Sequence, residues 1–298
     1  MMLSKEVCDA INGGVGVVAL ESTVIAHGLP HPQNLETAFE LERIVRAAGA
    51  VPATIAVFGG ECHVGLTVDQ IEQLATGKEI RKISRRDLAI AAGRRLDCAT
   101  TVATTAFFAH RAGIQVFATG GIGGVHRGYS ADVSADLPEL ARTPLTVVSS
   151  GAKIVLDLTA TREWLETFGV TVLGWQCNQM PAFYSRSSGL SIDETVDNAA
   201  EAAVIIKARD ALGLSNSILV TVPIPKEFGI ERDELEAILA DALKDADAKN
   251  IRGKEITPFL LSEMSRHSGG RTLTANIELL KNNARVAAEI AIELAANS

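Results

Sequence analysis

Short apolar runs recur along the chain, and stretches with helical signals separate them. Runs of this length, each ended by glycine or polar residues, are typical of buried β-strands. Strands that alternate with helices form a parallel sheet covered on both faces. The sequence therefore predicts an α/β protein, layered α/β/α around a mostly parallel or mixed central sheet, with a helical C-terminal part after about residue 225. The apolar runs occupy residues 15–20, 53–58, 114–118, 145–149, 170–174 and 218–222.

Capping signals place helices between these strands. Asn34 is the expected N-cap of a helix that Gly49 ends. Thr67-x-x-Gln70 has the spacing of a capping box. Because no linker, repeat or low-complexity stretch interrupts the pattern, residues 1–298 are expected to form one domain. Further helices are expected over residues 193–212, 231–251 and 274–296.

Composition narrows the class of protein. Hydrophobic residues make up 47% of the chain but aromatic residues only 4%, so aliphatic side chains build the core. A net charge of −8 argues against a general binder of nucleic acids or membrane surfaces, because phosphate groups need a basic face. The 4 cysteines lack Cys-x-x-Cys spacing, which indicates neither a zinc site nor a disulfide framework. Without a signal segment or a membrane-length apolar stretch, the protein is expected to be soluble and cytoplasmic.

The stretch Phe117–Gly128 combines glycines with charged side chains directly after an apolar run. Glycine has no Cβ, so backbone N–H groups there can close on a phosphate or carboxylate. His126 and Arg127 add donors, and residues 130–136 add oxygens suited to a hard cation or to sugar hydroxyls. On the residues alone, a ligand site and a glycine-rich turn with a solvated acidic loop both remain open.

Reactive side chains follow several of the predicted strands. Glu21, His126 with Asp132, and Lys153 each come after an apolar run, and ligands of open α/β sheets bind at the carboxyl ends of strands. A glutamate at such a position loses solvent, which raises its pKa and suits it to donate or accept a proton. The alternative for Glu21 is a helix cap or an ion-pair partner.

Lysines supply the other candidates. Lys153 follows Ser150–Ala152 at an expected helix start, where the helix dipole would favour the neutral amine that attacks a carbonyl carbon to form a Schiff base. The alternative is a solvated charge or a phosphate anchor. Lys82 lies just before a predicted helix start and is either a phosphate anchor or part of a solvated basic stretch.

The acidic residues after the glycines predict weak metal binding at most. Asp132 and Asp136 are four residues apart, but no third carboxylate follows at ligand spacing. A weakly held Mg²⁺ or Mn²⁺, bound through one carboxylate and several waters, fits this pattern better than a caged ion. His27 and His31 flank prolines and are expected to order a loop, since no helical His-x-x-x-His pair is present. The glycine run also lacks the Gly-Lys-Ser/Thr ending of a nucleotide-binding P-loop.

Several long motifs, in one order along the chain, resemble the pseudouridine-5′-phosphate glycosidase family, whose members include indigoidine synthase A-like proteins. The resemblance covers nearly the whole chain and includes Ala-Thr-Gly-Gly-Ile-Gly-Gly-Val-His-Arg-Gly and Pro-Ala-Phe-Tyr-Ser-Arg-Ser-Ser-Gly. The motifs occupy residues 19–30, 82–88, 118–128, 132–137, 150–153, 181–189, 254–261 and 275–284.

The resemblance implies reversible cleavage of the C–C glycosidic bond of pseudouridine 5′-phosphate to uracil and ribose 5-phosphate. It implies a divalent cofactor, usually Mn²⁺ or else another ion such as Mg²⁺, a small-molecule substrate, and a homotrimer. Lys153 matches the nucleophile on C1′ of the ring-opened sugar, Glu21 the proton donor and acceptor, and Asp132 the metal ligand. The implied substrate contacts are Lys82, Val102, His126, Ser134, Ala135, Asp136 and Asn276.

The sequence departs from the family pattern at residues 175–180, Val222 and residues 265–268, and its loop from Gly128 to Asp132 is about two residues short. These departures keep open a homologous enzyme that joins ribose 5-phosphate to another aromatic acceptor. A second alternative is a non-catalytic phosphosugar-binding protein. Glu21 together with Lys153 speaks against the latter, because binding alone requires neither.

Overall fold

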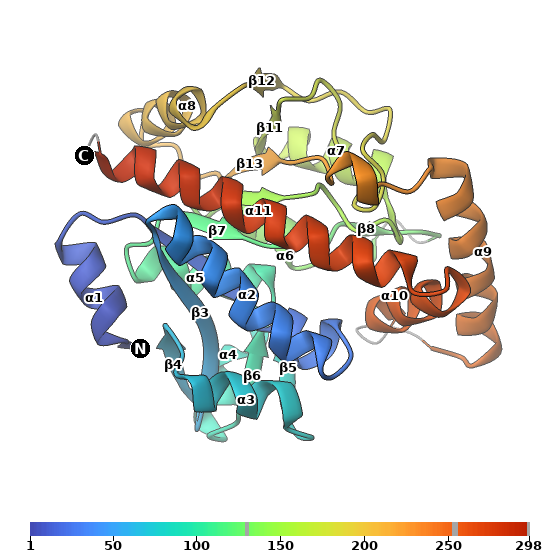
Figure 1. The fold of residues 1–298 in the computed structure, drawn as a ribbon, viewed down its shortest axis with the longest axis horizontal. Helices are drawn as coiled ribbons and strands as arrows, with labels where there is room; N and C mark the ends of the chain where they lie inside the picture. Colours follow the sequence, from blue (N-terminus) through green and yellow to red (C-terminus); the bar gives the residue numbers. More distant parts are fainter. Residues whose placement is uncertain (129–130, 252–255, 297–298) are drawn as a thin grey trace.

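A large sheet forms the centre of the computed structural model, which describes residues 1–128, 131–251 and 256–296 (Figure 1). Its strands follow the order β1-β4-β3-β2-β7-β9-β13-β11-β12, with β6 paired to β3 and β5 paired to β6. The strands are β1 (Met2–Leu3), β2 (Val17–Glu21), β3 (Val51–Phe58), β4 (Glu61–Val64), β5 (Arg81–Ile83), β6 (Cys98–Thr100), β7 (Val116–Ala118), β9 (Thr146–Ser149), β11 (Thr171–Trp175), β12 (Glu194–Val196) and β13 (Ile218–Thr221). A separate antiparallel pair joins β8 (Val125–His126) to β10 (Leu156–Asp157).

Neighbouring strands are parallel along the stretch β3-β2-β7-β9-β13-β11-β12 of the sheet. Within the described sheet, the antiparallel pairs are those of β4 and β6 with β3. Val18, Val147 and Val220 in the middle of this sheet are fully buried. Burial on both faces explains why these strands appear in the sequence as unbroken apolar runs. The predicted α/β class with a mixed, mostly parallel sheet is confirmed.

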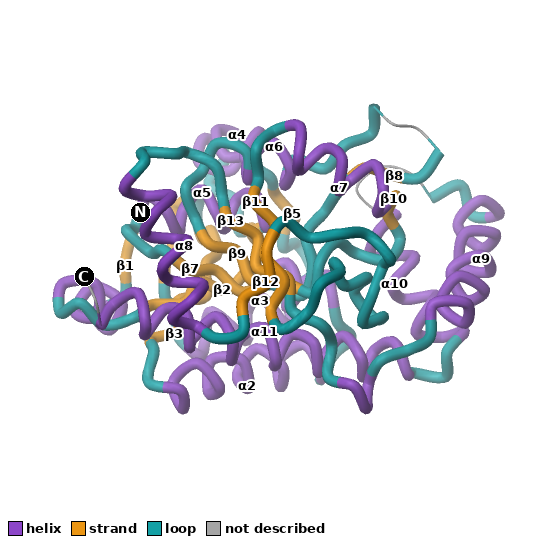
Figure 2. Tube along the Cα trace, turned by 90° about the horizontal axis from the view of Figure 1, so that it is seen from above, coloured by secondary structure: helices purple, strands orange, loops and turns teal. Residues whose placement is uncertain are grey.

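Helices cover both faces of the sheet (Figure 2). On one face, α2 and α11 lie side by side, and α11 packs across β2, β7 and β9. On the other face lie α5, which packs against β2, β3 and β7, and α6. The helices are α1 (Lys5–Asn12), α2 (Gln33–Ala48), α3 (Val68–Thr76), α4 (Leu88–Gly93), α5 (Val102–Arg111), α6 (Asp136–Leu140), α7 (Leu158–Thr167), α8 (Ala199–Ala211), α9 (Arg232–Ala248), α10 (Ile256–His267) and α11 (Arg271–Ala296), with short helical turns η1 (Val24–Gly28), η2 (Arg85–Asp87) and η3 (Lys226–Phe228). None of the helices in the described ranges has the length and apolar character of a membrane span.

Two helix starts differ from the sequence predictions. Asn34 is not the N-cap of α2, because the helix begins at Gln33 after Pro32, and the Asn34 amide instead donates to the carbonyls of Ile25 (2.9 Å) and Ala75 (3.0 Å). The helix expected from residue 193 begins at Ala199, because residues 194–196 pair with β11 first. The capping box from Thr67 to Gln70 at the start of α3 is confirmed.

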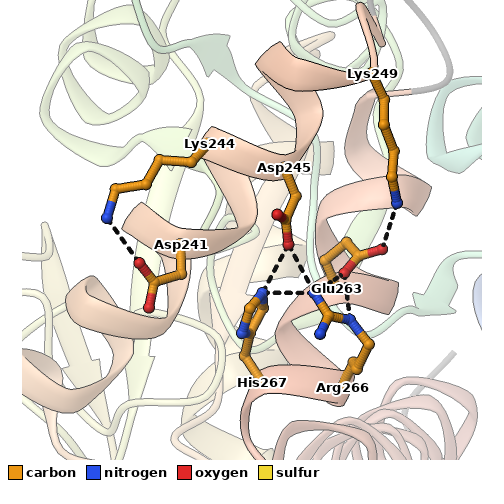
Figure 3. Close-up of polar contacts among 7 residues, drawn as sticks. All are labelled: Asp241, Lys244, Asp245, Lys249, Glu263, Arg266 and His267. Atoms are coloured by element: carbon orange, nitrogen blue, oxygen red, sulfur yellow. Dashed lines mark hydrogen bonds and ion pairs between the residues drawn. The ribbon is translucent and has the colours of Figure 1, made fainter.

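Helices α9 and α10 form a hairpin at one end of the sheet, where α10 also packs against η1 (Figure 1). Figure 3 shows the polar contacts of the hairpin: Asp245 of α9 contacts Arg266 (2.7 Å) and His267 (2.8 Å), while Glu263 binds Arg266 within α10 and Lys249 just after α9. Exposed pairs contribute at most about 1 kcal/mol each. Buried Leu239 and other apolar side chains between the helices therefore hold α10 in place.

Candidate active site

Three adjacent parallel strands, β2, β7 and β9, deliver polar residues to one edge of the sheet. Glu21 is the last residue of β2, Thr119 follows β7, and residues 150–153 follow β9. A cleft with about 490 Å³ of empty space, part of it continuous with solvent, lies at this edge. Its lining comprises Glu21, Thr23, Val24, His27, Gly28, Lys82, Thr119, Gly120, Gly121, Lys153, Phe183, Thr257, Pro258, Leu261, Asn276 and Leu280.

Glu21 is buried at the floor of the cleft. Its carboxylate accepts a hydrogen bond from the Thr119 hydroxyl. Burial raises the pKa of Glu21 above its ordinary value, while Lys153, the Thr119 bond and Lys82 oppose that rise and Asp136 adds to it. A buried carboxyl that keeps its proton more readily than a solvated one is suited to general acid catalysis.

A layer of buried hydroxyls fixes the end of β2 beneath Glu21. The Ser22 hydroxyl donates to the Ile55 carbonyl (2.7 Å) and accepts from the Thr100 N–H (2.9 Å). The Thr105 hydroxyl donates to that of Thr100 (2.9 Å), which itself donates to Ile55. Satisfied buried polar groups of this kind hold one geometry, so Glu21 lies on a rigid support.

Lys153 lies in the connection after β9, half-buried, and lines the same cleft. Its N–H donates to the Ile122 carbonyl (3.1 Å), and the Ile122 N–H donates to the Gly151 carbonyl (3.0 Å), so this connection runs beside the glycine-rich segment. The predicted helix start at Lys153 is wrong, because α7 begins at Leu158 with Asp157 as its N-cap. The helix-dipole argument for Lys153 therefore fails.

Two glycines of the glycine-rich segment are required by close packing. A Cβ on Gly121 would lie 2.8 Å from the Phe183 ring, and one on Gly123 would lie 2.2 Å from the Ser134 hydroxyl. The Gly123 N–H instead donates to the Asp136 carboxylate (2.8 Å). At these two glycines, the lack of a side chain lets the backbone approach other groups of the protein, not a phosphate or carboxylate ligand.

Asp136 is buried, and its carboxylate accepts from two backbone N–H groups, those of Gly123 and of Ala103 (2.9 Å). Ala103 is in the first turn of α5, next to the buried Val102. Asp136 thus joins the glycine-rich segment to the start of α5. Among the predicted substrate contacts, Lys82 and Asn276 line the cleft, whereas Val102, His126, Ser134, Ala135 and Asp136 do not belong to its lining.

The predicted metal ligand Asp132 lies outside the cleft lining as well. Its side chain is exposed, and its carbonyl accepts from the His126 N–H (2.8 Å). The short loop before it includes residues 129–130, which lie outside the described residues. In the part of the chain that the structure describes, the one group of three possible metal-ligating side chains is Asp245, Glu263 and His267, and its carboxylates already bind Arg266 and Lys249 (Figure 3).

Several residues of the cleft escaped the sequence predictions. Thr119 lies within the glycine-rich stretch, and its position after an apolar run was the signal that could have identified it. His27, interpreted as a loop-ordering residue, lines the cleft from η1. Thr257, Pro258 and Leu261 reach the cleft from α10, and only the tertiary packing of α10 on η1 places them there.

A second cleft, called the outer cleft below, adjoins the first and shares five lining residues with it: His27, Gly28, Pro258, Leu261 and Asn276. Ser265 and Arg266, part of a segment that departs from the family pattern, line this outer cleft. Trp175 and Val222, from the other departures, are buried and belong to the lining of neither cleft. The departure on α10 therefore borders this outer cleft, whereas Trp175 and Val222 do not.

Comparisons with known proteins show the family of the chain. Residues 6–293 match the family described as "Indigoidine synthase A like protein". The chain is 52% identical to the pseudouridine-5′-phosphate glycosidase of Caldanaerobacter subterraneus over 98% of this chain and 96% of that protein. It is also 52% identical to the glycosidase of the same name from Symbiobacterium thermophilum, over 98% and 97% of the two chains.

Solved structures of related proteins have the same fold as this chain. The prealnumycin C-glycosynthase AlnA in complex with ribulose 5-phosphate superposes with a TM-score of 0.91 and 41% identity, over 99% of this chain and 97% of that chain. An indigoidine synthase A-like protein from Thermotoga maritima gives a TM-score of 0.91 at 35% identity, over 99% and 96%. The chain belongs to the pseudouridine-5′-phosphate glycosidase family, the indigoidine synthase A-like proteins.

Proposed function

We propose that this protein catalyses the reversible cleavage of pseudouridine 5′-phosphate to uracil and ribose 5-phosphate through an imine on Lys153. The observation that carries the proposal is the presence of Lys153 and the buried Glu21 in one cleft, with electrostatic coupling between them. Curated relatives that are 52% identical over nearly their whole length bear the name of this glycosidase.

The chemistry explains why a lysine and an acid are needed. The bond to C5 of uracil offers no heteroatom leaving group, so the two-carboxylate mechanism of ordinary glycosidases is poorly suited to it. The Lys153 amine adds to C1′ as the bond from C1′ to the ring oxygen breaks, and the ring oxygen takes up a proton. Protonation at C5 then lets the C1′–C5 bond break while the nitrogen lone pair forms the C1′=N iminium.

Glu21 supplies the proton to C5, because its raised pKa keeps the carboxyl protonated at higher pH than a solvated glutamate. Water then hydrolyses the iminium to the aldehyde of ribose 5-phosphate and frees Lys153. Lys82 and Asn276 line the cleft and are proposed to bind the substrate. Val102, His126, Ser134 and Ala135 stay proposed substrate contacts from the flanking segments, whereas the Asp136 carboxylate is proposed to act through the backbone groups that it holds.

The test of the function is release of uracil from pseudouridine 5′-phosphate in the presence of Mn²⁺, together with the reverse condensation. We expect both directions to proceed and borohydride to trap a ribose 5-phosphate adduct on the protein. Absence of uracil release with every divalent ion tried would contradict the proposal.

We also propose that Asp132 holds a divalent ion, Mn²⁺ or Mg²⁺. The Asp132 carboxylate is exposed, so it would hold such an ion as a single protein ligand with water completing the shell. The ion would supply positive charge near an anionic substrate.

Removal of divalent ions with EDTA is expected to stop uracil release, and Mn²⁺ to restore it. Asp132→Asn is expected to weaken Mn²⁺ binding by roughly tenfold or more, measured by electron paramagnetic resonance as well as by activity. Asp245→Asn, in the carboxylate group on the α9–α10 hairpin, is the matched control and is expected to leave Mn²⁺ binding unchanged, because Asp245 already binds Arg266. Equal Mn²⁺ affinities of the two variants would contradict the assignment.

An alternative function is formation of a C-glycosyl bond between ribose 5-phosphate and another aromatic acceptor. It is favoured by the 41% identity to a C-glycosynthase and by the departure at Ser265 and Arg266 in the outer cleft. Condensation assays that offer ribose 5-phosphate with uracil or with larger aromatic acceptors distinguish the two functions. Faster reaction with a non-pyrimidine acceptor would favour the alternative.

The resemblance also leads us to propose a homotrimer that binds small phosphorylated substrates. Light scattering after size exclusion measures the assembly, and a mass of one or two chains would contradict the trimer.

A further inference from the structure

Asn283 is a fully buried polar residue in the middle of α11, the helix that crosses β2, β7 and β9. Its amide nitrogen donates to the Thr119 carbonyl (2.8 Å) and lies 3.4 Å from the Gly120 carbonyl oxygen. The Ser150 hydroxyl lies 3.2 Å from both the nitrogen and the oxygen of the same amide. One side chain therefore contacts the carboxyl ends of two neighbouring strands, β7 and β9.

The partners of Asn283 are connected to the two proposed reacting groups, one by a hydrogen bond and the other along the chain. Thr119 donates its hydroxyl hydrogen bond to Glu21. Ser150 begins the connection that leads to Lys153, and its N–H donates to the Gly120 carbonyl (2.9 Å). A displacement at Asn283 would therefore reach the acid through the Thr119 hydrogen bond and the amine along the covalent segment from Ser150 to Lys153.

The preceding residue offers a comparison of the same type on the same helix. The Asn282 amide donates to the Pro223 carbonyl (3.3 Å), and its oxygen accepts from Arg285 (3.0 Å). Asn282 is half-buried and does not belong to the cleft lining. It holds α11 to the chain after β13 without contacting the ends of β7 or β9.

We propose that Asn283 is a positioning residue that holds the end of β7 against the end of β9, so that the Thr119 hydroxyl meets Glu21 and Lys153 faces the same carboxyl. The catalytic part of this inference rests on the proposed function. A misplacement of about 1 Å at such a site lowers catalysis by up to roughly 100-fold.

The sharpest readout is the ionisation of Glu21 in the protein without substrate. The Thr119 hydroxyl bond lowers the pKa of Glu21, so its loss raises that pKa further. The other charged residues that act on Glu21, namely Lys153, Lys82 and Asp136, are all still present in the Asn283 variant. A shift therefore reports the Thr119 bond and the relative placement of Lys153.

The experiment follows the Glu21 carboxyl by ¹³C NMR during a pH titration, with the resonance assigned by its loss in Glu21→Gln. We expect Asn283→Ala and Thr119→Val to raise the pKa of Glu21, and the double variant to add little to the larger single effect, since both act on one bond. Asn283→Ala is also expected to lower kcat for uracil release by about 10- to 100-fold with little change in KM. Asn282→Ala, the matched control, is expected to change neither quantity.

A folded Asn283→Ala protein with the Glu21 titration of wild type would overturn the positioning role, whatever the activity. If Asn283→Ala does not fold, Ser150→Ala removes one partner of the amide and is expected to lower kcat in the same way but less. Wild-type kcat in a folded Ser150→Ala protein would then overturn the inference. If wild type released no uracil but Asn283→Ala still shifted the Glu21 titration, the proposed function would fail and the positioning role would stand.

Discussion

Lys153→Arg is expected to lower uracil release from pseudouridine 5′-phosphate by roughly 10⁴-fold or more, the scale on which enzymes lose activity when a covalent nucleophile is removed. The guanidinium keeps the positive charge near Glu21 but does not deprotonate in proteins, so it cannot attack C1′. Borohydride treatment with ribose 5-phosphate is expected to add the reduced sugar to Lys153 of wild type and to leave the variant unmodified. Mass spectrometry of peptides measures both results.

Lys82→Ala is the control for this experiment, because Lys82 lines the same cleft and acts on the same carboxyl. We expect this variant to bind substrate more weakly and still to form the adduct on Lys153. An adduct that maps to Lys82, or that persists in Lys153→Arg, would contradict the assigned nucleophile.

Glu21→Gln is expected to lower uracil release by about 10² to 10⁴-fold, the usual contribution of a general acid. Glutamine fills the same space and can still accept from Thr119, but it has no proton to give to C5. Because Lys153 is intact, ribose 5-phosphate is still expected to form the borohydride-trapped adduct. Steady-state rates and adduct mass together separate proton transfer from imine formation.

The pH dependence follows from the raised pKa of Glu21. Cleavage needs the protonated acid, so wild-type activity is expected to fall as the pH rises through the folded-state pKa, and this limb is absent from Glu21→Gln. The raised pKa of Glu21 also affects the free energy of unfolding. The stability that Glu21 contributes is fully present below the pKa that it has in the unfolded chain, and it is lost as the pH rises through the pKa that it has in the folded protein. Glu21→Gln is therefore expected to melt at a higher temperature than wild type at alkaline pH, with the difference shrinking toward acid.

Glu42 provides a matched control for burial without catalysis. It lies on α2, accepts from the Thr54 hydroxyl (2.6 Å), and burial raises its pKa as it does for Glu21. Glu42→Gln is expected to keep full uracil release while shifting stability in the same direction. Equal losses of activity in the Gln variants at 21 and 42 would contradict a specific role for Glu21.

Much of the fold was predictable because its signals are local. Apolar runs marked the strands, since a sheet buried on both faces needs unbroken apolar sequence. Local signals failed where two local structures competed. Residues 194–196 joined the sheet instead of a helix because β11 offered hydrogen-bond partners, and Lys153 lies five residues before α7 because Asp157 caps that helix.

The candidate site was predictable in its residue types and only partly in its arrangement. Glu21 and Lys153 were expected together because the carboxyl ends of parallel strands share one edge. The sequence predicted that Asp136 contacts the substrate, but its carboxylate accepts hydrogen bonds from the N–H groups of Gly123 and Ala103. A carboxylate that binds substrate and one that accepts from backbone N–H groups show the same local pattern, an acidic residue shortly after glycines. The sequence alone therefore does not distinguish them.

By itself, the sequence determined the class of fold and the family and indicated the proposed pair of reacting groups, because periodicity, capping and long motifs are encoded in neighbouring residues. The tertiary structure decided which strand ends are adjacent, that α10 borders the cleft, and that Asn283 meets Ser150 from 133 residues away. Those features depend on pairing between distant segments. The free energy of such pairing comes from burial and from hydrogen bonds that exist only once the chain has folded.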